Sequence, residues 1–176
     1  MSALVSLDVG SLQEPGPTGS GGPSSAFTLS GQVADPGTYA AVTLQALHQD
    51  TAETATYMAA SGKVTDTYTG VPLWTLLQDA GLVSDPTIKN DVLRDVVVAT
   101  GSDGYRAVIS LGEIDPSFGN QPDLVAYKDT AGQLGPNGAD GFARLVLPND
   151  QAGGRYVSNL VSLQVVDVTS LHSTQT

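Results

Sequence analysis

The sequence predicts an α+β domain built of mixed β-sheets with few short helices. Three observations lead to this prediction. Many short runs rich in β-formers are separated by turn residues, and the chain carries 20 Gly and 10 Pro. Only one segment has the clear periodicity of an amphipathic helix. Strands and helices do not alternate regularly, which argues against a Rossmann fold. With 176 residues, the chain can bury one sizeable core.

The ends of the chain are expected to lie outside this domain. Residues 1–26 are predicted to form an N-terminal arm and linker, in which residues 1–8 could add one strand and residues 14–25 are rich in Pro, Gly and Ser. Such a linker cannot bury a core. The folded domain is predicted to span residues 27–168, and residues 169–176 form a polar tail.

The first elements of the domain are a strand and a short helix. Residues 27–33 alternate apolar and polar side chains, as a half-buried strand does. Asp35, Pro36 and Gly37 predict a turn. Thr43 is then expected to cap a short helix that carries Leu44 and Leu47.

A hairpin and the clearest helix follow. Residues 54–60 and 63–69 are two β-rich runs separated by Ser61 and Gly62, a spacing typical of a tight hairpin. Pro72 suits the first turn of a helix, and Gly81 suits the left-handed residue that ends one. The apolar residues between them have helical spacing: Leu73, Leu76, Leu77 and Ala80.

The second half of the domain is predicted to be mostly strand. The expected strands are 95–100, 104–111, 123–127, 142–147 and 155–168. Residues 112–120 form a turn-rich stretch, and residues 129–141 form a polar loop with a turn at Asn137 and Gly138.

Charge and composition exclude several classes of function. The formal net charge is −11 with only seven Lys and Arg, so nucleic-acid binding and docking on anionic lipid are not expected. No apolar run is long enough to span a membrane, which takes about 20 residues. Low charge density suggests a periplasmic or extracellular protein, although this chain shows no signal peptide. Without cysteine there is no disulfide, thiolate nucleophile or iron–sulfur ligand.

Four segments, taken in order, resemble one protein family. They are Tyr68–Leu77 with Ala80 and Gly81, Ser102–Tyr105, Leu145–Asp150, and Gly153–Val157 continuing into Leu160–Leu163. Together they resemble the molybdopterin-binding domain of the sulfite oxidase family, and more closely the short bacterial proteins that carry this domain alone. The resemblance covers residues 27–168 and implies the sulfite-oxidase-like molybdopterin-binding fold.

The resemblance also implies candidate cofactor-binding residues. In the family, an arginine at the position of Arg155 contacts the phosphate end of the cofactor, and Gly153 and Gly154 allow the backbone to approach a ligand or a strand. Tyr105 and its neighbour Arg106 lie near the pocket in the family. The alternative for Arg155 is an ion pair with a carboxylate such as Asp150, which would pin the last strand. No catalytic residue is assigned.

The departures from the family pattern concern the metal. Members that bind the cofactor carry a molybdenum-ligating cysteine in the loop before the segment at Gly70, whereas residues 51–67 here contain no cysteine and only one basic residue, Lys63. A family lysine that follows the glycine–arginine motif is also lost, and Ser158 stands near its position. Thiolates are the protein ligands that soft metals favour. We therefore expect no metal site and no cofactor, with bound molybdopterin as the alternative.

These observations leave three hypotheses for function. The first is a cofactor-free relative of molybdopterin-dependent oxidoreductases, acting as a ligand-binding or structural module for a small anionic ligand or a protein partner. The second is a molybdopterin-binding oxidoreductase with non-cysteine metal ligation. The third is a subunit of an extracellular assembly that docks through residues 1–25, by adding a strand to a neighbour's sheet.

Other polar groups have simpler explanations. His48 and His172 are far apart in the sequence and match no histidine metal motif. Glu113 and Asp115 flank a turn, where they could orient a ligand, but turn chemistry is the simpler explanation. The acidic loop 129–140 lacks the spacing of an EF-hand.

Overall fold

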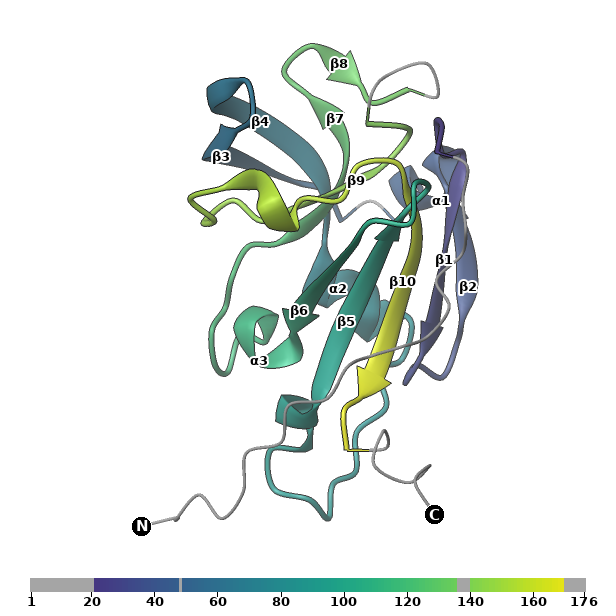
Figure 1. The fold of residues 1–176 in the computed structure, drawn as a ribbon. Helices are drawn as coiled ribbons and strands as arrows, with labels where there is room; N and C mark the ends of the chain where they lie inside the picture. Colours follow the sequence, from purple (N-terminus) through teal and green to yellow (C-terminus); the bar gives the residue numbers. More distant parts are fainter. Residues whose placement is uncertain (1–20, 48, 136–139, 170–176) are drawn as a thin grey trace.

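The computed structural model describes residues 21–47, 49–135 and 140–169 (Figure 1). The predicted strand in residues 1–8, the turn at Asn137 and Gly138, and both histidines lie outside these ranges. The strands run from Ala26 to Asp167 and form two sheets, so the expected mixed-sheet α+β architecture is confirmed.

The first sheet has five strands in the order β2-β1-β10-β5-β6. Their bounds are β1 Ala26–Gly31, β2 Gly37–Ala40, β5 Asp95–Gly101, β6 Arg106–Ser110 and β10 Leu160–Asp167. β1 and β10 are parallel, and the other neighbours are antiparallel. The first and last strands of the domain therefore lie side by side (Figure 1).

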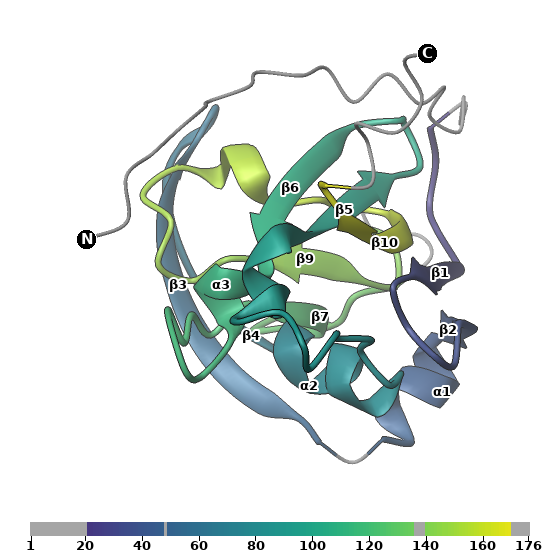
Figure 2. The same cartoon turned by 90° about the horizontal axis from the view of Figure 1, so that it is seen from below.

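The second sheet is built on the predicted hairpin. Its strands are β3 Thr51–Ala59, β4 Gly62–Pro72, β7 Leu124–Asp129, β8 Gly132–Gln133 and β9 Arg144–Val146. β3 and β4 pair along their whole length, from Thr51 opposite Gly70 to Ala59 opposite Gly62, which confirms the hairpin. Its two turn residues are Ala60 and Ser61, one position before the predicted Ser61 and Gly62, because Gly62 already pairs as the first residue of β4. This long ribbon curves around one side of the molecule (Figure 2).

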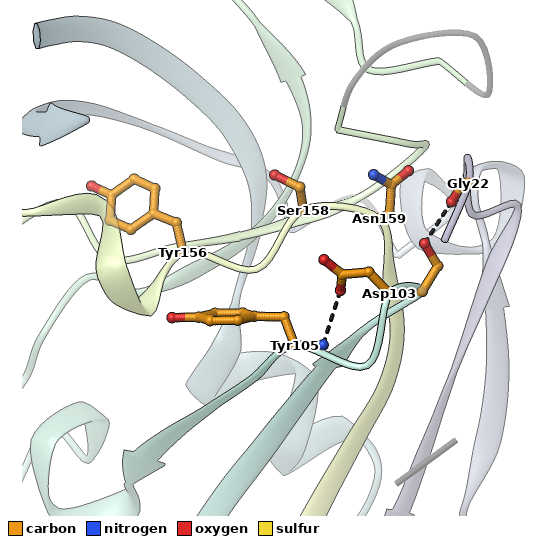
Figure 3. A pocket seen from close by; sticks show the side chains of 7 residues that line it. Gly22, Asp103, Tyr105, Tyr156, Ser158 and Asn159 are labelled. Atoms are coloured by element: carbon orange, nitrogen blue, oxygen red, sulfur yellow. Dashed lines mark hydrogen bonds between the residues drawn. The ribbon is translucent and has the colours of Figure 1, made fainter. Parts of the chain in front are cut away.

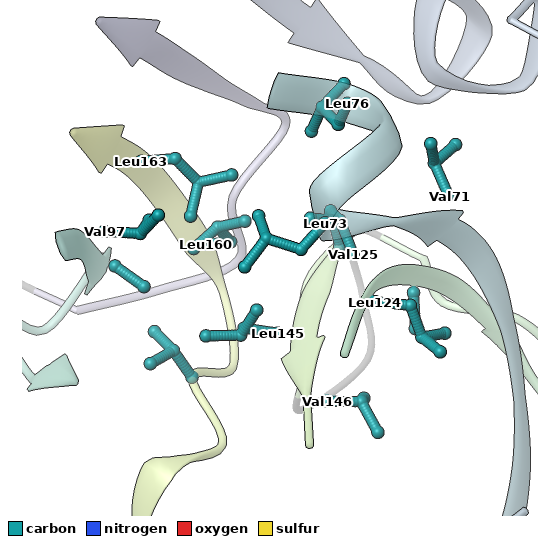
Figure 4. Packing of buried hydrophobic residues seen from close by; sticks show 14 of the residues in the cluster. Val71, Leu73, Leu76, Val97, Leu124, Val125, Leu145, Val146, Leu160 and Leu163 are labelled. Atoms are coloured by element: carbon teal, nitrogen blue, oxygen red, sulfur yellow. The ribbon is translucent and has the colours of Figure 1, made fainter. Parts of the chain in front are cut away.

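The main helix agrees with its prediction. Helix α2 spans Leu73–Asp79, directly after β4, and Gly81 has the left-handed φ of 70° expected of a helix stop. Leu73 and Leu76 of this helix are fully buried. Figure 4 shows them where the two sheets meet, with Leu163 of β10 on one side and Val125 of β7 on the other.

The two shorter helices differ from expectation. Helix α1 spans Ala41–Gln45, so Thr43 is its third residue and not its cap; the Thr43 hydroxyl reaches back to the N–H and C=O of Ala40, at 2.8 and 2.9 Å. Helix α3, Leu111–Ile114, lies in the stretch predicted as turns, because Ser110 and Glu113 form a capping box around its first turn. In the described ranges, no helix has the length and apolar character that a membrane span requires.

The last strand starts later than predicted. Gly153–Arg155 is a short 3-10 helix, and β10 begins only at Leu160. The chain turns between them at Asn159, whose φ of 51° is incompatible with a strand. This turn leaves residues 153–159 as a connection beside the β3–β4 hairpin, and this connection contributes side chains to the cluster and to both pockets described below.

Candidate functional site

A cluster of three tyrosines and one arginine fills the inner side of the β3–β4 hairpin. Tyr57 on β3 and Tyr68 on β4 are buried, and their hydroxyl oxygens lie 3.3 Å apart. Arg144 on β9 donates a hydrogen bond from Nη2 to the Tyr57 hydroxyl at 3.2 Å. The ring of Tyr156, which follows the 3-10 helix, lies 4.4 Å from that of Tyr57, centroid to centroid. Side chains from the hairpin, from β9 and from the segment after the 3-10 helix thus meet in one cluster.

The charge of Arg144 is compensated inside this cluster. Its guanidinium lies 5.3 to 5.9 Å from the centroids of the three tyrosine rings, within the range of cation–π attraction. Nη1 also pairs with the Asp140 carboxylate at 3.2 Å. Asp140 in turn accepts a hydrogen bond from the Ser158 hydroxyl. Burial raises the pKa of Tyr68 and Tyr156, so both phenols stay neutral at physiological pH.

The two predicted glycines have different environments. A Cβ on Gly153 would lie 2.9 Å from the Tyr57 ring, so glycine is needed there for the backbone to cross the ring. A Cβ on Gly154 would meet nothing within 4 Å. Gly154 contributes its carbonyl oxygen instead, which accepts a hydrogen bond from the Tyr105 hydroxyl. Gly153 therefore belongs to the tyrosine cluster and Gly154 to the neighbourhood of Tyr105.

Tyr105 lines a polar pocket at the end of the β5–β6 hairpin. The pocket has a volume of about 380 Å³ and is lined by Gly22, Ser102, Asp103, Tyr105, Tyr156, Ser158 and Asn159 (Figure 3). Figure 3 shows the two tyrosines at one end, Asn159 and Gly22 at the other, and Asp103 between them. The end of the N-terminal linker forms one wall, because Ser102 donates a hydrogen bond to the Gly22 carbonyl at 2.6 Å.

The hydroxyl groups that line this pocket are better placed to accept hydrogen bonds from a ligand than to donate them. Ser102, Tyr105 and Ser158 each donate their hydroxyl hydrogen to another group of the protein. Their oxygens keep lone pairs that can accept from a ligand. Asp103 accepts from the Tyr105 N–H through Oδ1 at 2.9 Å, and a carboxylate has further acceptor capacity. The pocket is therefore suited to a ligand that carries several hydrogen-bond donors.

Arg155 lies apart from this pocket and is held by two carboxylates. Nε and Nη2 donate to the two oxygens of Asp150 at 2.9 and 2.7 Å, and Nη1 donates to both oxygens of Glu113 at 3.2 and 3.3 Å. These hydrogen bonds and charges raise the pKa of the guanidinium further. The ion pair with Asp150 predicted as the alternative for Arg155 is present, and Glu113 adds a second partner that the sequence did not indicate.

A second pocket opens beside this ion-pair network. It has a volume of about 420 Å³ and is lined by Gly112, Glu113, Gly119, Gln121, Asp123, Asn149, Asp150 and Arg155. Its most unusual member is Asp123, which is 5% exposed. Burial, more than its charged neighbours, raises the pKa of this carboxyl to about 7.

Sequence reasoning missed Arg144, Tyr57, Tyr68 and Asp123. One signal for Arg144 was available, because it is the only charged residue in the apolar run 142–147. A charge in a buried strand needs a partner, and therefore marks a polar cluster in the interior. Asp123 gave no comparable signal, because it stands at the start of a strand, where aspartate is common after a turn.

Asp115 has the turn role that was expected, whereas Glu113 caps α3 and binds Arg155. Asp115 accepts from the Ser117 N–H at 2.7 Å, and Asp129 accepts from the N–H groups of Ala131 and Gly132 at 2.8 and 3.0 Å. Within the part of the chain that the structure describes, no three His, Cys, Asp or Glu side chains are placed to hold a metal ion.

Comparisons with known proteins show the fold. No protein-family model matches the chain, and no curated protein matches it by sequence. Among solved structures, the chain is similar to the sulfane dehydrogenase SoxCD from Paracoccus pantotrophus, with a TM-score of 0.63 and 21% identity over 81% of this chain. The chain spans 38% of the length of that protein. This likeness confirms the sulfite-oxidase-like fold expected from the four motifs.

The residues present do not fit the molybdopterin cofactor that the fold implies. The interval 51–67, where the family carries its cysteine, lies in a regular hairpin, and its buried Tyr57 packs against Tyr156 and contacts Tyr68. Arg155 already binds two carboxylates and cannot offer its charge to a phosphate without losing them. Asp123 beside it would add repulsion to a polyanion.

Proposed function

We propose that this protein is a cofactor-free binding module with the sulfite-oxidase-like fold, and that the Tyr105 pocket binds a small, uncharged ligand rich in hydroxyl groups, such as a sugar. The observation that carries the proposal is the composition of this pocket. It combines two tyrosine rings with hydroxyl and carboxylate oxygens that remain able to accept hydrogen bonds. Amphipathic aromatic rings and a few oriented polar groups are typical of ligand pockets.

The charges around the pocket favour a neutral ligand over the anionic one expected from the sequence. Asp103 contributes a carboxylate, and the described residues that line the pocket include no basic side chain. Two arginines of adjacent segments, Arg144 and Arg155, already pair with carboxylates, and Arg106, which follows Tyr105, is not among the residues that line the pocket. An anion would therefore meet the repulsion of Asp103 without a basic side chain among the described lining residues to offset it.

The size of the pocket limits the ligand. A volume of about 380 Å³ is at the small end of the range for ligand sites, roughly 300–1,000 Å³, which suits one or two sugar rings. The exposed ring of Tyr105 can stack on the apolar face of a sugar. The side-chain oxygens of Asp103 and Ser158 can accept hydrogen bonds from the hydroxyl groups of the sugar. A periplasmic or extracellular location, where such ligands are met, is part of the same proposal.

NMR titration with a defined panel of neutral mono- and disaccharides tests the ligand. We expect at least one sugar to shift the backbone amide signals of Ser102–Tyr105 and Ser158–Asn159, whereas sulfated sugars do not. Tyr105→Ala should abolish the shifts. Val108→Ala, which changes an exposed apolar residue on β6, the strand that follows Tyr105, should leave them unchanged. The proposal is wrong if no neutral sugar shifts these signals, or if sulfated sugars bind more tightly.

Metal and pterin analysis tests the absence of the cofactor. The protein should be produced in a host with ample molybdenum cofactor and assayed for molybdenum and for fluorescence of acid-released pterin. We expect neither above the level of a control protein. Near-stoichiometric molybdenum and pterin would instead support the oxidoreductase with non-cysteine ligation. The hypothesis of docking through residues 1–25 concerns mainly residues outside the described ranges.

A further inference from the structure

The second pocket contains a buried carboxyl group that the protein leaves without a partner. Asp123 is 5% exposed and lines this pocket. Among the described residues, none donates a hydrogen bond to its carboxyl oxygens, although its backbone carbonyl accepts from the Leu73 N–H at 2.8 Å. Buried carboxylates normally have hydrogen-bond or charge partners, because desolvation is costly. A partner from outside the chain would supply what is missing.

The neighbouring charges do not neutralise Asp123. Glu113 from α3, and Asp150 and Arg155 from the segment after β9, are the charged groups that line the pocket with it. Arg155 divides its five donors between Glu113 and Asp150. The two negative charges of this network already exceed its one positive charge, and an ionised Asp123 would add a third. The pocket therefore has an excess of negative charge at neutral pH.

The walls of the pocket are held in place by the local fold. Gly119 donates from its backbone N–H to the Gly112 carbonyl at 3.0 Å, and a Cβ at Gly119 would lie 2.3 Å from the Glu113 carbonyl oxygen. The loop after α3 therefore packs tightly on the helix. On the other side, the Asn149 amide donates to the Gln121 side-chain oxygen at 2.7 Å. The amide oxygen of Asn149 remains available to accept from a ligand.

We propose that this pocket binds the primary ammonium group of a small organic amine, with the Asp123 carboxylate as its charged partner and the Asn149 amide oxygen as a second acceptor. A volume of about 420 Å³ accommodates an amine of several carbons. An ammonium group offers three donors from one compact charge, which suits a pocket whose open positions are acceptors. This site is separate from the Tyr105 pocket and goes beyond the function proposed for that pocket.

Binding should depend on pH through Asp123. Its pKa of about 7 means that the carboxyl is largely neutral below pH 6 and ionised at pH 8. The charged groups that face Asp123 in the pocket are Glu113, Asp150 and Arg155, which pair with one another. An alkylamine is protonated throughout. Affinity should therefore rise about tenfold between pH 6 and pH 8.

Calorimetric titration with 1,4-diaminobutane tests this site, with 1,4-butanediol as an uncharged probe of similar length. We expect the diamine to bind, the diol not to bind, and Asp123→Asn to weaken binding at least tenfold and remove its pH dependence. Asp79→Asn removes an exposed carboxylate on α2 and should leave binding unchanged. Nonspecific attraction to an acidic protein would weaken equally in both variants.

A second measurement covers the case in which Asp123→Asn does not fold. The pKa of Asp123 can be followed in the wild-type protein from the ¹³C shift of its carboxyl group. Saturating diamine should lower this pKa by at least one unit, because a bound cation favours the ionised form. An unchanged pKa, or equal binding of the diol and the diamine, would overturn the proposal. Neither result would affect sugar binding at Tyr105.

Discussion

The ring of Tyr57 packs against the ring of Tyr156, with their centroids 4.4 Å apart and their planes inclined by 44°. This contact joins the β3–β4 hairpin to the connection that leads into β10. Tyr57 lies in residues 51–67, the interval in which the sulfite oxidase family carries its metal-ligating cysteine, and here side chains pack against one another at this point. The interior of this domain is therefore stabilised by packing at that point, and removal of either ring would leave a cavity.

Tyr57→Ala should destabilise the protein by about 3 kcal/mol, since truncation of a buried aromatic residue costs roughly 3–5 kcal/mol and also leaves Arg144 without one of its partners. Urea unfolding followed by circular dichroism measures this. Met58→Ala, at an exposed neighbouring position, should change the free energy of unfolding by less than about 0.5 kcal/mol. Equal effects of the two substitutions would show that the tyrosine cluster is unimportant for stability.

Gly153→Ala and Gly154→Ala form a matched pair. The first places a Cβ 2.9 Å from the Tyr57 ring, and we expect a loss of about 1–3 kcal/mol from this overpacking. The second meets nothing within 4 Å, and we expect a change within about 0.5 kcal/mol. Thermal unfolding of both variants checks the prediction. A larger effect at Gly154 would contradict the close approach of residue 153 to the ring.

Arg155 and Asp150 should be energetically coupled. A double-mutant cycle with Arg155→Gln and Asp150→Asn, measured by urea unfolding, should give a coupling energy of about 1 kcal/mol, because the pair is bidentate but only partly buried. Coupling should weaken in 1 M NaCl. A coupling energy near zero in low salt would mean that Arg155 is free to serve another partner, such as an anion.

Asp95 should make stability depend on pH. It is 4% exposed, and burial, followed by the charges of Asp167 and Asp91, raises its pKa to about 6. Between pH 4 and pH 6 the folded protein keeps this proton while the unfolded chain loses it. The free energy of unfolding therefore falls as pH rises through this window, by about 2 kcal/mol for this group.

Asp95→Asn removes this titration. The melting temperature of the variant, taken relative to the wild type, should increase from pH 4 to pH 6 and then level off. The positive charge of Arg94 acts on the pKa of Asp95 in the opposite direction, and more weakly than burial. A difference that is constant with pH, or that shrinks toward neutral pH, would show that Asp95 has an ordinary pKa.

Local patterns predicted the regular elements well. The β3–β4 hairpin, the helix after Pro72 and the stop at Gly81 each depend on residues close in sequence, and the structure has all three, with the hairpin turn one position before its prediction. Helix α3 was missed because four residues are too short for a periodic signal. The Thr43 cap was misplaced by three positions, because the hydroxyl bonds backward to Ala40.

The fold class, the main secondary structure and the lack of a thiolate ligand can be derived from the amino-acid sequence, because they follow from local periodicity, turn chemistry and composition. Which polar groups meet cannot be derived in this way. Arg155 reaches Glu113 across 42 positions of sequence, and Arg144 reaches Tyr57 across 87. Such pairings depend on strand register and on where connections cross a sheet. Strand register and the path of the connections also explain why side chains fill the tyrosine cluster, whereas the pockets at Tyr105 and Asp123 remain open.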